Sequence, residues 1–189
     1  LGGNFEWTDG VELVLDASVR RKDQDSDFRN QDQSRDTVLT TWGLTPRINL
    51  DALVFDKALS SIMGLDVYYV DYNSDRKRNP QSAPFTRVEG RQSSFAVYAQ
   101  NTLEVTPRFS ITGGARLERF NFTAGDTAFP NNPGSFGFPQ TTFRPSLTDI
   151  DVEYAWNLGF DHGLGENFGL YGHVGRGYRT PTIDERSGT

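Results

Sequence analysis

The chain has 189 residues, of which 35% are hydrophobic, 13% aromatic and 23% charged, with 19 glycines, no cysteine and a formal net charge of −6. For a soluble domain, this aliphatic share is low and the glycine and aromatic contents are high, which disfavours a large side-chain core. The acidic balance argues against nucleic acid as a partner. No run of about 18 apolar residues occurs, which excludes a transmembrane helix. Leu1 shows no signal-peptide leader, so we expect a mature chain or a piece of one.

Apolar and polar residues alternate with a period of two, which predicts β-strands along the chain. A partial strand ends near Trp7. After it, Val11, Leu13 and Leu15 alternate with Glu12 and Asp16, so this strand has one apolar face and one polar, water-facing face. Further strands are predicted over 37–54, 59–76, 94–105, 109–124, 150–161 and from Tyr171 onward.

The predicted connections alternate between short and long. Short turns are expected at 8–10, 55–57, 106–108 and 163–167, and long polar loops at 24–36, 77–90 and 125–149. The last loop contains several prolines, which cannot donate to a β-ladder. This sorting is typical of up-and-down outer-membrane barrels, which have brief periplasmic turns and extended extracellular loops. The alternative is a soluble antiparallel sandwich, whose loops do not usually sort by length.

A membrane-spanning sheet requires the two faces of each strand to differ, because a charge on a lipid-facing position costs about 2–4 kcal/mol near the midplane. Lipid is expected to meet Val11, Leu13, Leu15, Met63, Leu65, Val67, Phe95, Val97, Leu103, Val152, Tyr154, Trp156, Leu158, Leu170 and Val174. Water or polar partners are expected at Glu12, Asp16, Asp66, Gln100, Glu104, Arg116, Glu118, Asp151, Glu153, Asn157 and His173.

Aromatic residues near the predicted strand ends are candidates for interfacial girdles, where an amphipathic ring lies at head-group level. The candidates are Trp7, Trp42, Tyr68, Tyr69, Tyr72, Trp156 and Tyr178.

Near its end the chain reads Gly175-Arg176-Gly177, then Tyr178-Arg179-Thr180-Pro181, then Asp184-Glu185. This stretch resembles the segment of TonB-dependent outer-membrane receptors in which a barrel strand runs into an aromatic-Arg-small-Pro motif. With the strand pattern upstream, the resemblance covers most of the chain. It implies an all-β fold, an antiparallel up-and-down transmembrane β-barrel in the outer membrane of a Gram-negative bacterium. Residues 1–189 would then form part of one barrel domain and supply about eight of about 22 strands.

The resemblance also implies a function. Such receptors import a scarce solute, and a ferric siderophore is the first choice here, with haem or cobalamin as alternatives. The TonB complex supplies the energy through a plug domain that is absent from this chain. Haem receptors of the family carry an aromatic-Arg-Ala-Pro motif, whereas this chain has Thr180 in place of Ala. Ligand-binding candidates on the extracellular side are Arg87, Phe143, Arg144 and Arg179.

Outer-membrane lipid and lipopolysaccharide are further expected partners, with the run Asp75-Arg76-Lys77-Arg78 placed to meet lipopolysaccharide phosphates. No cofactor is expected. The main alternative is a complete small eight-stranded barrel with a passive, structural or adhesive role. Because the chain begins within a strand and residues 184–189 read as a loop, we expect instead roughly the middle third of a larger barrel.

No catalytic or metal site is predicted, and the chain is expected not to be an enzyme. Asp161 and His162 are adjacent, but neighbouring residues of a strand point to opposite faces and cannot cooperate. His162 and His173 are too few for a metal site. The acidic residues Asp23, Asp25, Asp27 and Asp32 match no calcium loop and are read as solvated.

Overall fold

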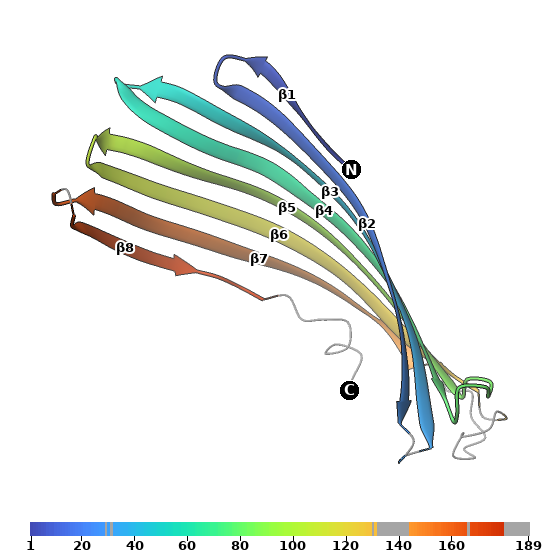
Figure 1. The fold of residues 1–189 in the computed structure, drawn as a ribbon. Coiled ribbons are helices and arrows are strands. Elements are labelled where there is room, and N and C mark those ends of the chain that lie inside the picture. The colour runs from blue at the N-terminus through green and yellow to red at the C-terminus, as the bar shows by residue number, and fades with distance from the viewer. Residues whose placement is uncertain (29, 31, 130, 132–143, 166, 180–189) are drawn as a thin grey trace.

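The computed structural model describes residues 1–28, 30, 32–129, 131, 144–165 and 167–179. These residues form one curved sheet of eight antiparallel strands, each paired with the next in chain order (Figure 1). The strands are β1 Gly2–Thr8, β2 Val11–Phe28, β3 Gln33–Val54, β4 Lys57–Lys77, β5 Thr86–Thr106, β6 Phe109–Ala128, β7 Arg144–Gly163 and β8 Gly169–Arg176. The described residues contain no helix that is long and apolar enough to cross a membrane. The predicted all-β, up-and-down antiparallel arrangement is confirmed.

The short turns all lie at one end of the sheet, as Figure 1 shows. Phe55 and Asp56, which join β3 to β4, have φ angles of 52° and 61°. A two-residue hairpin turn of type I′ requires positive φ at both positions, because only that twist matches the strands. Gly10, between β1 and β2, has a φ of 77°, and a Cβ atom there would lie 2.3 Å from the carbonyl oxygen of Asp51. Only glycine fits this turn without displacing its neighbour.

The connections at the opposite end are shorter than predicted. The predicted loop 24–36 is largely strand, because β2 and β3 pair up to Phe28 and Gln33. The predicted loop 77–90 shrinks to 78–85, and β6 continues to Ala128. Within the predicted loop 125–149, residues 130 and 132–143 lie outside the described residues. The predicted boundaries between strands and loops were wrong because a β-ladder needs only paired backbone groups. Polar strand ends therefore extend the sheet without a period-two signal.

The strand register places the two predicted sets of residues on opposite faces of the sheet. For example, Leu65 pairs with Val97, which pairs with Leu117 and then Tyr154. We call the side that carries these residues the aliphatic face. On the other side, Asp66, Ala96, Glu118 and Glu153 form the neighbouring row, and we call this side the polar face. The predicted separation of the two sets is confirmed.

The aliphatic face forms a band of limited height. On β4 this face is apolar from Leu59 to Tyr69 except at Ser61, and Asp71 follows. The band spans about 34 Å of strand at about 3.4 Å per residue, which is about 26 Å of height at a tilt of about 40°. That value agrees with the ~25 Å apolar band of outer-membrane barrels. β4 then continues to Lys77, well beyond the band.

The buried aromatic side chains lie on the polar face. Tyr72 and Phe122 are 4% and 0% exposed, and both pack in a cluster with Val88 and Ala124. This placement corrects the girdle prediction for Tyr72 and for Tyr68, which shares its face with Ser94. The prediction was wrong because a strand end says nothing about which face a ring occupies.

Trp42 and Tyr69 do lie on the aliphatic face, at the end of the band, with ring centroids 5.5 Å apart. Trp156 shares this face but lies in mid-band, in the row of Ala115, so it is not a girdle residue. Trp7 is 70% exposed close to the turn between β1 and β2.

Candidate functional site

A polar network on the polar face connects the end of β8 with β4 and β6. Arg116 on β6 is bonded to Asp66 on β4 and, at 2.9 Å and 3.1 Å, to Glu118. Tyr178 donates its hydroxyl proton to Glu118 and accepts a 3.0 Å hydrogen bond from Arg116 Nε. One guanidinium therefore lies between two carboxylates. Because Asp66 and Glu118 are 15% and 9% exposed, removal of this cation would leave two nearly buried carboxylates without a counter-charge.

Tyr178 belongs to the predicted motif, and its position corrects the girdle prediction. Its ring stands edge-on to Phe120, with centroids 6.1 Å apart and an interplanar angle of 74°. β8 ends at Arg176, so the motif begins where the chain leaves the ladder and crosses toward β6. Thr180 and Pro181 lie outside the described residues. The sequence predicted Arg116 and Glu118 on the water-facing side of the strand but could not connect them with Tyr178, because the contact between Tyr178 and Glu118 spans 60 residues of chain.

Beside this network the polar face is hollowed by a pocket of about 500 Å³. Its polar lining includes Asp66, Gln100, Arg116, Asn157 and His173. Gly114 also lines the pocket, and a Cβ atom there would lie 2.8 Å from Asn157 Oδ1. The lining suits a polar or charged occupant, because these groups donate and accept hydrogen bonds.

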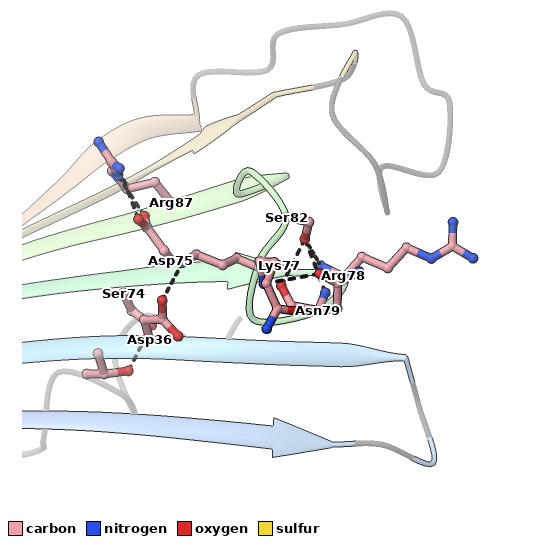
Figure 2. A network of polar contacts seen from close by, with 10 residues as sticks. Asp36, Ser74, Asp75, Lys77, Arg78, Asn79, Ser82 and Arg87 are labelled. Carbon is pink, nitrogen blue, oxygen red and sulfur yellow. Dashed lines mark hydrogen bonds and ion pairs between the residues drawn. The ribbon is translucent and has the colours of Figure 1, made fainter.

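A second network lies at the far end of β4 and β5, beyond the aliphatic band (Figure 2). Arg87 binds Asp75 with both arms of its guanidinium, at 2.7 Å and 3.0 Å, and Lys77 binds Asp36. The hydrogen bonds to Asp75 raise the pKa of Arg87 above its ordinary value. Figure 2 shows Arg78 extending away from these pairs into open space. The pairs neutralise Arg87 and Lys77 but leave Arg78 without a charged partner among the described residues.

The loop between β4 and β5 is held by its own polar groups. Ser82 Oγ accepts 3.1 Å hydrogen bonds from the backbone amides of Arg78 and Asn79. It donates to the carbonyl oxygen of Asn79, whose side chain caps Gln81 at 3.1 Å. A loop that satisfies its own backbone presents its tip in a defined conformation.

The predicted ligand candidates are distributed unevenly. Arg87 lies on β5 in the bidentate pair with Asp75. Arg144 begins β7, but its side chain lies outside the described set, as does all of Phe143. Arg179 follows Tyr178 and is exposed. Arg87 thus lies on β5, whereas Arg179 lies beyond the end of β8 at Arg176.

Asp161 and His162 lie on opposite faces of β7, as expected, since Asp161 pairs with Tyr171 and His162 with Leu170. His162 packs edge-on against Phe109 at 5.6 Å. Among the described residues, no group of three His, Cys, Asp or Glu side chains could hold a metal ion.

The sequence matches the family model described as TonB dependent receptor-like, beta-barrel, over residues 1–189. The chain belongs to this family. Comparison with curated proteins gave no significant match. The fold of this receptor segment resembles that of the ferric-catecholate import receptor Fiu from E. coli K12, with a TM-score of 0.76, 12% identity, and coverage of 92% of this chain and 34% of Fiu.

Two further solved structures are similar. The ferric citrate transporter FecA in its unliganded form gives a TM-score of 0.74 at 14% identity, covering 92% of this chain and 26% of FecA. The ferric yersiniabactin uptake receptor FyuA from Yersinia pestis gives a TM-score of 0.59 at 15% identity, covering 91% of this chain and 26% of FyuA. The TonB-dependent receptor segment described here therefore spans about a quarter to a third of these proteins.

Proposed function

We propose that the chain is part of the barrel wall of an outer-membrane receptor that imports a ferric chelate with energy from the TonB complex. The observation that carries the proposal is the family match over all 189 residues. The family is one of receptors and not of enzymes. The three similar structures are receptors or transporters of ferric compounds, which favours an iron chelate over haem or cobalamin.

The wall belongs to a larger barrel in this proposal. β1 and β8 are the two edges of the described sheet, and no backbone pairing joins them among the described residues. A closed eight-stranded barrel pairs its first strand with its last. In a bilayer each unpaired backbone group costs several kcal/mol, so both edges need further strands. The proposal supplies these strands and the plug domain from elsewhere in the protein. It ranks above the small passive barrel for this reason.

The aliphatic band meets the outer-membrane lipid in this arrangement, and the polar face meets the barrel interior. The end with short turns faces the periplasm and the end with charged strand tips faces outward, as in other barrels of this type. Arg76 continues the polar face at the extracellular mouth, and Arg78 is the first residue of the β4–β5 loop, with its side chain extending away from the sheet. Neither has an ion pair with another described residue, so both can bind an anionic chelate without first breaking a pair.

Arg87, Phe143, Arg144 and Arg179 remain proposed contacts to the chelate. Of these, Arg87 has its guanidinium occupied on both arms by Asp75, and both side chains lie on the strand face that continues the aliphatic band and not on the face toward the barrel interior. Its contribution to affinity is therefore expected to be smaller than that of Arg78.

The test is uptake of radiolabelled ferric chelates by cells that carry the full-length receptor, with and without an active TonB complex. Uptake is expected only with the active complex. Changing Arg76 and Arg78 together to Gln is expected to raise the half-saturating chelate concentration. Arg108→Gln, in an exposed periplasmic turn, serves as the matched control and is expected to leave it unchanged. Uptake that is equal without TonB, for every chelate that enters, would overturn the proposal.

A further inference from the structure

β8 leaves the sheet before it has covered the edge of β7. It has eight residues, and its last pair joins Arg176 to Trp156 of β7. The aliphatic face of β7 is apolar from Phe160 up to Ile150, so the upper half of this apolar stretch has no paired strand on the β8 side among the described residues. Unpaired backbone groups are costly in hydrocarbon, so this edge favours the addition of a further strand segment.

The three residues that follow β8 cross the polar face instead, and we call residues 177–179 the strap. Tyr178 reaches past β7 to β6, where its hydroxyl donates to Glu118 and its ring stands edge-on to Phe120. No strand pairing of the described sheet includes the strap. Gly177 lines the pocket beside the polar network. The strap therefore lies on the side of the wall that faces the interior of the proposed barrel, and the contacts of Tyr178 hold it there.

The side chain of Arg176 occupies the place where β8 would continue. In the register of β7 and β8, Tyr178 would lie opposite Tyr154 if β8 were longer. The Arg176 guanidinium now lies 3.7 Å from the centroid of the Tyr154 ring. It donates to the carbonyl oxygen of Tyr154 and, at 3.2 Å, to the carboxylate of Glu153. Side-chain contacts thus cover a part of the β7 edge that a continued backbone can also cover.

The carboxylates near the strap keep a cation whether or not Tyr178 is bound. Arg116 holds Glu118 at 2.9 Å, and this ion pair does not involve the tyrosine. In a continued β8, Arg179 would lie opposite Glu153 on the polar face, so Glu153 would exchange its present arginine for another one. Movement of the strap therefore leaves neither carboxylate as an unpaired charge.

We propose that the strap exchanges between a docked state, in which Tyr178 is bonded to Glu118, and an extended state, in which residues 177–179 continue β8 along β7. The inference rests on the proposed function. A chelate that passes along the polar face meets the docked strap beside the pocket of about 500 Å³. The extended state moves the strap into the wall, which clears the polar face and pairs the free edge of β7. Gly177 gives the backbone the freedom that this change of direction requires.

Pairs of cysteines test the extended register in a full-length receptor without other cysteines, in native outer membranes. Tyr154→Cys with Tyr178→Cys is expected to form a disulfide, because opposite residues of neighbouring strands lie about 4.5–5.5 Å apart. In the docked state the two residues lie on opposite faces of the sheet and cannot react. Leu158→Cys with Val174→Cys, an existing pair, is the positive control. Trp156→Cys with Tyr178→Cys is two residues off the register, about 7–8 Å apart, and is expected to give no disulfide.

Two locked states test what the exchange does. A cleavable thiol cross-linker that spans about 10 Å, two strand spacings, joins Glu118→Cys to Tyr178→Cys and holds the docked state. Ferric-chelate binding is expected to remain and uptake to be lost until the linker is cleaved. The disulfide between positions 154 and 178 holds the extended state and is expected to permit uptake. Ser60→Cys with Thr112→Cys places the same linker between β4 and β6 on the same face, and this matched control is expected to import normally.

Tyr178→Phe tests the hydroxyl contact with no cross-link. It keeps the aromatic ring but loses the hydrogen bond to Glu118, which disfavours the docked state. Uptake is expected to become faster by up to about fivefold, the equilibrium effect of one lost hydrogen bond. A residue that only stabilised the wall would instead slow uptake when it is replaced.

Any of three results would overturn the inference. One is no disulfide between positions 154 and 178 when the positive control forms. Another is uptake by the docked lock that equals that of its uncross-linked form, or that falls no further than uptake by the linker control. The third is slower uptake by Tyr178→Phe at normal receptor abundance. Failure of the proposed function appears differently, as uptake by the uncross-linked receptor that does not need TonB.

Discussion

Leu65 lies at the centre of the aliphatic band on β4, six residues from Leu59 and four from Tyr69 at the two ends. It also lies in the row of Val97, Leu117 and Tyr154, where no polar side chain interrupts the face. If this face meets lipid, Leu65→Arg places a charge near the bilayer midplane. The expected cost is about 2–4 kcal/mol in the free energy of unfolding from vesicles.

Two comparisons make this prediction specific. Leu59→Arg puts the same charge on the same strand and face, but at the edge of the band, and is expected to cost about 0–1 kcal/mol. Gln100→Arg is close to the midpoint of the band but on the polar face, and as an exposed substitution it is expected to stay within about 0.5 kcal/mol. The measurement is denaturant unfolding of the full-length barrel in vesicles. Equal costs for Leu65→Arg and Gln100→Arg would refute the assignment of the two faces.

Three further predictions follow from the turns and the polar network. Arg116→Leu leaves Asp66 and Glu118 without their cation and is expected to destabilise the barrel by about 1–3 kcal/mol. Tyr178→Phe removes one hydrogen-bonding group and is expected to cost about 1 kcal/mol. Denaturant unfolding of the two variants checks this order, and a larger loss of stability for Tyr178→Phe would contradict it. Phe55→Asn relieves a side chain held at positive φ and is expected to stabilise the turn by about 1 kcal/mol, so a lower melting temperature would speak against a strained turn. Gly10→Ala is expected to lower the free energy of unfolding by more than about 1 kcal/mol. Gly3→Ala is the control and is expected to be close to neutral, because its Cβ would meet no atom within 4 Å. Similar melting temperatures for the two variants would be inconsistent with the described turn.

The strand faces were predictable from the sequence because alternation has a physical cause. A pleated strand sends neighbouring side chains to opposite faces, so Val11, Leu13 and Leu15 separate from Glu12 wherever the strand begins. The turns were predictable where their chemistry is local, as at Gly10. These signals need no knowledge of the partner strand.

Strand ends and cross-strand contacts were not predictable in the same way. On β6, Phe120 and Phe122 lie on the polar face, whereas Arg119 and Asn121 lie on the aliphatic face, which reverses the pattern of the earlier part of the strand. A single sequence cannot show whether such a reversal marks a loop or a continued strand in a new environment. The link from Tyr178 to Glu118 depends on the register of β6, β7 and β8, which no local pattern encodes.

Environment scanning along β4 would test the barrel-wall assignment. Single cysteines would be placed at each position from Leu59 to Tyr69 of the full-length receptor in native outer membranes, with a spin label on each; this chain contributes no cysteine of its own. Contact with lipid-soluble oxygen and with a water-soluble relaxation agent would then be measured at each position. A period of two is expected, with oxygen contact highest at the odd-numbered positions and greatest near Leu65. Uniform contact with the water-soluble agent at all positions would contradict a wall that separates lipid from the barrel interior.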